Sequence, residues 1–152
     1  MTTPIPPIHR TFFTTLDPMI ASLGVLGNLF MPASILKSYT PDYQTPIANE
    51  TTVLLNSSAG YLACIMVLQI FLLRARPNDL VVWKTVQGAF CVTDVAILWA
   101  LCNVLSVEGR TGVGSWRVEE WGNIGVTGLC AVLRGAFVMG VGLGGRGKGK
   151  KA

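Results

Sequence analysis

Apolar residues gather in four long blocks along this chain. Each block holds few charged side chains, and together they cover about residues 19–36, 53–73, 81–105 and 122–144. About 20 helical residues are enough to cross a hydrocarbon core of about 30 Å. Because lipid offers the backbone no hydrogen-bond partner, each block must satisfy its own peptide groups as a helix. The pattern predicts an all-α, four-helix transmembrane bundle with short loops, whose first span begins at Met19 or as early as Phe12.

The composition favours a membrane protein over a soluble one. Of the 152 residues, 51% are hydrophobic and 13% are charged, and the mean hydropathy is +0.52. An average soluble domain carries about 25% charged residues, so this chain could hardly cover a soluble surface. The N-terminal stretch MTTPIPPIHR lacks the basic region and short apolar core of a cleavable signal peptide. We therefore expect the first span to be retained.

Basic residues are divided unequally between the two sides of the predicted bundle. Four spans place both termini on one side, which would hold eight of the twelve Lys and Arg residues, against three on the other. The positive-inside rule then predicts cytoplasmic termini, with the endoplasmic reticulum as the default membrane. The glycine-rich basic segment 145–152 is predicted to be a disordered cytoplasmic tail that is attracted to anionic lipid. Neither this tail nor the net charge of +4 indicates a nucleic-acid partner.

Four polar side chains stand near the midpoints of the four predicted spans: Asn28, Tyr61, Asp94 and Arg134. A charge at the centre of the bilayer costs several kcal/mol, and such residues usually face the bundle interior and pair. Asp94 and Arg134 have opposite charges, lie in adjacent spans and have matching depths, so we predict that they form an ion pair. The pair fits two interpretations, a structural contact that fixes helix register and a reaction or ligand site.

Three further carboxylates, Asp17, Glu119 and Glu120, have both a structural and a functional interpretation. Asp17 precedes Pro18, which is typical of a helix start. If the helix begins near Phe12, Asp17 instead lies inside the leaflet and could face a cavity. Glu119 and Glu120 open the fourth span, where acidic residues suit the helix dipole. Because Asp17 and Glu120 are expected near opposite membrane faces, a site with three carboxylates is geometrically awkward.

Several kinds of functional site are not expected. His9 is the single histidine and lies outside the predicted spans, so a histidine-based triad is not predicted. The four cysteines show no CxxC spacing, and no HExxH or GxSxG motif is present, so we predict neither a metal site nor a cofactor. Trp99 lies deep in the third span, where it either packs in the bundle or contacts a substrate.

The central polar residues could act on a lipophilic substrate that enters sideways from the membrane. An ionised Asp94 could serve as nucleophile or as general base on a water, with Arg134 holding it ionised and oriented. Tyr61 or a protonated Asp17 could donate a proton to an oxygen leaving group, and Asn28 could position water or substrate. This combination suits epoxide hydrolysis, intramolecular cyclisation or acid-initiated isomerisation. The spacing does not select among them.

Five short motifs carry a resemblance over about residues 8–144: Asp17-Pro18, DLVVWKTV (79–86), Asp94, Trp121-Gly122-Asn123 and Leu133-Arg134. In these the chain is similar to a family of small four-span fungal membrane proteins catalogued as a domain of unknown function. Members often have a histidine soon after the third-span aspartate, whereas this chain reads VAILWAL there.

The chain also resembles the small hydrolases encoded beside polyketide synthases for polyene pyrones of the citreoviridin and aurovertin type. This second resemblance implies that an epoxide on a polyene is opened to build oxygen heterocycles. It also implies that Asp17, Asp94 and Glu120 serve as acid or base and that Arg134 orients them.

Two hypotheses from different classes follow. The first is an integral-membrane hydrolase or cyclase of fungal secondary metabolism, which acts on an epoxidised lipophilic polyketide without metal or organic cofactor. The second is a non-catalytic membrane protein that binds lipid or supports a partner, with Asp94 and Arg134 as a structural pair. A small transporter that uses Asp94 for proton coupling is less expected, because no inverted repeat is recognisable and the chain would have to form an oligomer.

Overall fold

The computed structural model describes residues 5–143, which form helices and connecting turns with no strand among them. Four helical segments are long and apolar enough to cross a membrane: Pro7–Phe30, Asn49–Ala75, Leu80–Val107 and Val118–Met139. These confirm the predicted all-α transmembrane bundle, and the chain is a multi-pass membrane protein. The basic segment 145–152 lies outside the described residues.

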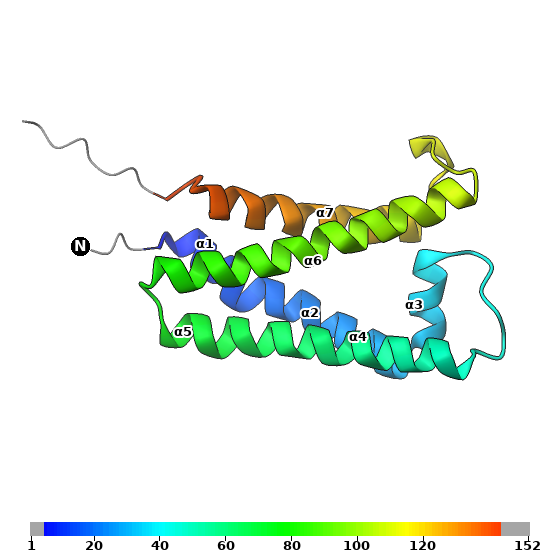
Figure 1. The fold of residues 1–152 in the computed structure, drawn as a ribbon, viewed down its shortest axis with the longest axis horizontal. Helices are drawn as coiled ribbons and strands as arrows, with labels where there is room; N and C mark the ends of the chain where they lie inside the picture. Colours follow the sequence, from blue (N-terminus) through cyan, green and yellow to red (C-terminus); the bar gives the residue numbers. More distant parts are fainter. Residues whose placement is uncertain (1–4, 144–152) are drawn as a thin grey trace, which may run out of the picture.

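The bundle is built from two pairs of long helices. Helix α2 packs along α4 and helix α6 packs along α7, while the short helix α3 lies across one end and contacts both α2 and α7 (Figure 1). We call this the α3 end, and the opposite end, where α1 begins and α7 finishes, the terminal end. The bounds of these elements are α1 Pro7–Thr11, α2 Asp17–Phe30, α3 Pro32–Tyr39, α4 Asn49–Val67, α6 Leu80–Val107 and α7 Val118–Met139.

The first span differs from the predicted range 19–36. It begins at Pro7 and ends at Phe30. The chain breaks at Met31, which has φ −132° and ψ 50°, because the following Pro32 disfavours helical backbone in the residue before it. Residues 32–36 therefore belong to the separate helix α3. As a consequence, Asp17 lies in the middle of the first span and does not cap its start.

A proline inside this span is accommodated by local π-helical geometry. Pro18 has no N–H to donate to the carbonyl of Thr14, and the guanidinium of Arg74 donates to that carbonyl instead, at 2.7 Å. The preceding turn, η1 (Phe12–Leu16), is π-helical, and so is η2 (Leu68–Leu72), which follows α4 and contacts η1. A π turn shifts the facing of the side chains near it and is frequent at functional sites.

An apolar cluster closes the terminal end of the bundle. It contains a buried residue from each of the four spans, together with Ile5: Phe13, Leu73, Trp83 and Phe137. The rings of Phe13 and Phe137 meet edge to face with centroids 5.3 Å apart. The indole N–H of Trp83 donates to the carbonyl of Arg76 at 2.9 Å, so its polar edge is satisfied although the side chain is buried.

A network of charged residues closes the α3 end. Arg110 donates to Glu120 at 2.8 Å, and the backbone N–H and guanidinium of Arg117 donate to Glu120 at the same distance. Arg110 also donates to Glu108, whose second partner is the hydroxyl of Thr40 at 2.8 Å. The hydrogen bonds from Arg110 and Thr40 hold the pKa of Glu108 below its ordinary value. The network ties the end of α6 to the start of α7 and to the residue that follows α3.

We predict that Glu120→Gln lowers the stability of the bundle. Glu120 is 1% exposed and accepts from two guanidinium groups, and a charged hydrogen bond contributes about 1.5–3 kcal/mol. The measurement is the thermal unfolding midpoint of the purified protein in detergent. Its neighbour Glu119, whose side chain is 39% exposed and pairs only with Lys37 among the described residues, provides the control. Glu119→Gln should leave the midpoint nearly unchanged, and equal losses in the two variants would contradict the assigned role.

Candidate functional site

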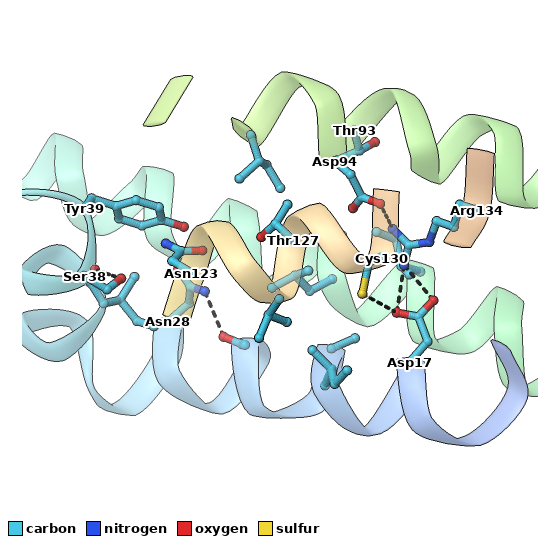
Figure 2. A pocket seen from close by; sticks show the side chains of 18 residues that line it. Asp17, Asn28, Ser38, Tyr39, Thr93, Asp94, Asn123, Thr127, Cys130 and Arg134 are labelled. Carbon is cyan, nitrogen blue, oxygen red and sulfur yellow. Dashed lines mark hydrogen bonds and ion pairs between the residues drawn. The ribbon is translucent and has the colours of Figure 1, made fainter. Parts of the chain in front are cut away.

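One arginine joins two aspartates in the middle of the bundle. Arg134 of α7 donates through Nη1 to Asp94 Oδ2 of α6 at 2.5 Å. Through Nη2 it donates to Asp17 of α2, at 2.6 Å to Oδ2 and 2.8 Å to Oδ1 (Figure 2). The predicted ion pair between Asp94 and Arg134 is confirmed. Asp17 is a second partner that brings the first span into the same cluster.

We call Asp17, Asp94 and Arg134 the triad, and all three side chains are buried inside the bundle. Asp17 is 2% exposed, Arg134 is 4% exposed and Asp94 is 7% exposed. In a low-dielectric interior an unpaired charge is far more costly than a paired one. One guanidinium faces two carboxyl groups, so the triad is electrically neutral when the two carboxyl groups share a single proton.

The two aspartates differ in how fully their oxygens are occupied. Asp17 accepts from Arg134 and also from the amide of Gln69, which belongs to the π turn η2 and is fully buried. The thiol of Cys130 lies 4.0 Å from Asp17 Oδ1. Asp94 accepts from Arg134 through Oδ2, and its Oδ1 makes no hydrogen bond within residues 5–143. The carboxyl group of Asp17 therefore has more hydrogen-bond donors around it, and Asp94 keeps one oxygen free for a ligand.

The free oxygen of Asp94 lies beside a cavity of about 240 Å³. Eighteen residues from α2, α3, α4, α6 and α7 line it. Ile20 of α2 and Val126 of α7 line the cavity and are also exposed on the surface, at 39% and 46%. Parts of the cavity lining on α2 and α7 are therefore both apolar and accessible.

Two helices contribute matching stripes of residues to this cavity. On α2 the stripe is Asp17, Ala21, Gly24 and Asn28, and on α7 it is Asn123, Thr127, Cys130 and Arg134. Each stripe follows the spacing i, i+4, i+7, i+11, which keeps four residues on one face over three turns. The helices run in opposite directions, so Asp17 meets Arg134 at one end while Asn28 and Asn123 stand together at the other (Figure 2).

The remaining predicted site residues lie away from the triad. Asn28 lines the cavity but stands three turns from Asp17 along α2, so the prediction that it shares a plane with Asp94 is wrong. Tyr61 does not line the cavity: it is 45% exposed, and its hydroxyl bonds Thr93 Oγ1. Trp99 is 70% exposed on the outer face. Glu120 belongs to the network at the α3 end, as expected from its distance to the other carboxylates.

Several residues of the site were not among the predicted ones. They are Gln69, which bonds Asp17, and the cavity residues Tyr39, Asn123, Thr127 and Cys130. The spacing of the α7 stripe is visible in the sequence and could have found three of these, whereas the fold of α3 and the π turn around Gln69 could not be read from spacing. No group of three or more His, Cys, Asp or Glu side chains within residues 5–143 is arranged to hold a metal ion.

We predict that Arg134→Met strongly destabilises the protein. The variant leaves two buried carboxylates without a cation, and breaking a buried charge pair costs about 3–5 kcal/mol. The measurements are accumulation in membranes and thermal unfolding in detergent, with Arg76→Met as the control because Arg76 is exposed and its side chain forms no ion pair among the described residues. Adding Asp17→Leu and Asp94→Leu to Arg134→Met should restore accumulation. Normal accumulation of Arg134→Met alone would contradict the electrostatic account.

Comparison with known proteins identifies a family. A family model described as a domain of unknown function, DUF7704, matches residues 2–144. No curated protein and no solved structure matches the chain. Since the match covers nearly all of the sequence, the protein belongs to the DUF7704 family, whose function is unknown.

Proposed function

We propose that this protein is a membrane enzyme that opens an epoxide on a lipophilic molecule by acid–base chemistry between Asp94 and Asp17. The observation that carries the proposal is the arrangement at one end of the cavity. A single guanidinium holds two carboxyl groups, and one of these has an unoccupied oxygen beside space for a ligand. Epoxide opening needs a proton donor at the leaving oxygen and a base for the incoming group.

The hydrogen bonds favour a definite division of roles. Asp17 receives N–H groups from Arg134 and Gln69, which stabilise its ionised form. Asp94 receives a single guanidinium contact and therefore holds the shared proton, placed on its free Oδ1. Arg134 is a positioning residue that balances the charge of Asp17 and fixes both carboxyl groups.

The reaction proceeds in a balanced step. Asp94 gives its proton to the epoxide oxygen while the bond from that oxygen to carbon breaks. A water, or a hydroxyl of the substrate itself, forms the new bond to that carbon and loses its proton to Asp17. Transfer of one proton from Asp17 back to Asp94 restores the starting state. Water yields a diol by hydrolysis, and an internal hydroxyl yields a cyclic ether.

The sequence supports a more specific proposal for the substrate and for the membrane in which the protein lies. The resemblance to the hydrolases of polyene-pyrone clusters supports an epoxidised polyene polyketide of fungal secondary metabolism as the substrate. The accessible apolar side chains of Ile20 and Val126 in the cavity lining are consistent with entry of a lipophilic substrate from the bilayer. The distribution of basic residues supports an endoplasmic-reticulum protein with cytoplasmic termini.

We predict that Asp94→Asn abolishes turnover, because an amide cannot donate a carboxylic proton, while the side chain keeps its shape. The assay incubates microsomes containing the protein with an epoxidised polyene and follows the diol or cyclic ether by mass spectrometry. The expected loss is at least about a hundredfold, the usual contribution of a general acid. Asp42→Asn, in an exposed loop, is the matched control and should turn over normally.

The same experiment distinguishes the enzyme from the non-catalytic alternative. Normal accumulation of Asp94→Asn without turnover supports catalysis. Normal turnover removes Asp94 from the chemistry. No turnover by the wild-type protein, combined with poor accumulation of Asp94→Asn, favours a lipid-binding or partner-supporting protein whose triad is structural.

A further inference from the structure

The cavity is chemically different at its two ends. Among its eighteen lining residues, Asp17, Asp94 and Arg134 are the charged ones, and all three lie at one end. The opposite end carries uncharged polar side chains from three helices: Asn28 of α2, Ser38 and Tyr39 of α3, and Asn123 of α7. Between the ends the lining is mostly apolar or small, with residues such as Ala21, Gly24 and Ile97.

The uncharged end keeps hydrogen-bonding capacity for a ligand. Asn28 uses its amide N–H on the carbonyl of Gly24 at 2.8 Å, which leaves its Oδ1 as an acceptor. Ser38 donates to the carbonyl of Ile35 at 2.7 Å and keeps its oxygen as an acceptor. The hydroxyl of Tyr39 and the side-chain amide of Asn123 form no hydrogen bond within the described part of the chain, and Figure 2 shows both beside Asn28. Partly buried polar groups of this kind gain most from a ligand that pairs with them.

The separation of the two ends follows from the helices themselves. Asp17 and Asn28 are eleven residues apart on α2, and Asn123 and Arg134 are eleven residues apart on α7. Eleven helical residues span about 16 Å, so both helices give the same distance between the polar group and the charged group. The cavity volume of about 240 Å³ lies below the range of about 300–1,000 Å³ usual for drug-sized ligands. This small volume and the separation of the two ends, about 16 Å along the helices, together suit one slender chain.

We propose that Asn28, Ser38, Tyr39 and Asn123 form a head-group subsite, which binds the uncharged, hydrogen-bonding end of an elongated lipophilic substrate. This subsite holds the reactive group at the charged end of the cavity, beside Asp94. The inference rests on the proposed function for the reaction, but the binding itself requires only the cavity. Charged amphiphiles are disfavoured, because no opposite charge lines this end to compensate their desolvation.

Three epoxides of matched chain length test the subsite. Each carries the epoxide at the chain end, and the other end is a primary amide, a carboxylate or a plain methyl group. We expect wild-type protein to show a kcat/KM for the amide about tenfold above that for the methyl compound, and the carboxylate to be the poorest. Tyr39→Phe, which removes one hydroxyl, and Asn123→Leu, which removes the amide at similar volume, should each lower the amide-to-methyl ratio roughly three- to tenfold, the value of one hydrogen bond.

Asn103→Leu is the matched control, because Asn103 is exposed on α6 and does not line the cavity. Its amide-to-methyl ratio should equal that of the wild type. An unchanged ratio in both Tyr39→Phe and Asn123→Leu, or a preference for the carboxylate, would overturn the subsite. If Tyr39→Phe and Asn123→Leu keep their turnover with an unchanged amide-to-methyl ratio, the proposed reaction remains and only the subsite is rejected.

A binding experiment separates the two proposals if no epoxide is turned over. The probe is a dodecyl-length amide with a photoactivatable diazirine at the chain end, mixed with the detergent-purified protein and irradiated. We expect labelled peptides that contain Asp94 or Arg134, and several-fold less labelling in Asn123→Leu. Such labelling without turnover would support the subsite and reject the epoxide chemistry. Labelling that is as strong in Asn123→Leu as in the wild type would reject the subsite. Labelling of peptides elsewhere on the bundle would also reject it.

Discussion

The central constraint on this molecule is that one guanidinium must neutralise carboxyl groups from two other helices in a place where water cannot do so. Arg134 reaches Asp94 on the neighbouring α6 and Asp17 on the opposite helix pair. Removing Arg134 leaves two buried carboxyl groups without a cation, and its contacts with both aspartates hold the three helices in one register. The same constraint makes the site chemically interesting, because one arginine and two carboxyl groups are neutral only when a proton is shared.

The bundle is fastened at both ends and hollow between them. The aromatic and aliphatic cluster at the terminal end draws a residue from every span, and the charged network at the α3 end joins α6 and α7 to the residue that follows α3. Between these closures the α2/α4 pair and the α6/α7 pair do not fill the space, and the cavity forms there. The two clusters therefore hold the helices together on either side of a polar interior site.

The sequence predicted the four spans and the pairing of Asp94 with Arg134 because both follow from strong, local signals: long apolar blocks and isolated charges within them. The position of Asp17 was harder to predict, because Asp-Pro is typical of a helix start. Here the π turn and the hydrogen bond from Arg74 to the Thr14 carbonyl let the helix continue through Pro18. Tyr61 and Trp99 were placed by depth alone. Depth does not decide which face of a helix a residue occupies: Trp99 turns outward, and Tyr61 is partly exposed and bonds Thr93 outside the cavity lining that it was expected to join. The i, i+4, i+7, i+11 stripes supply that missing information for α2 and α7.

The π turn before Asp17 makes the length of this segment as important as its composition. Each helical residue turns the chain by about 100°, and the wide turn at Phe12–Leu16 supplies the offset that aims Asp17 at Arg134. Substitutions of the exposed residues Thr15 and Leu16 keep the residue count and should preserve this aim. Insertion or deletion of one residue there would rotate the carboxylate toward a neighbouring face of the helix. We therefore expect this segment to be more sensitive to changes in length than to substitution of its exposed side chains.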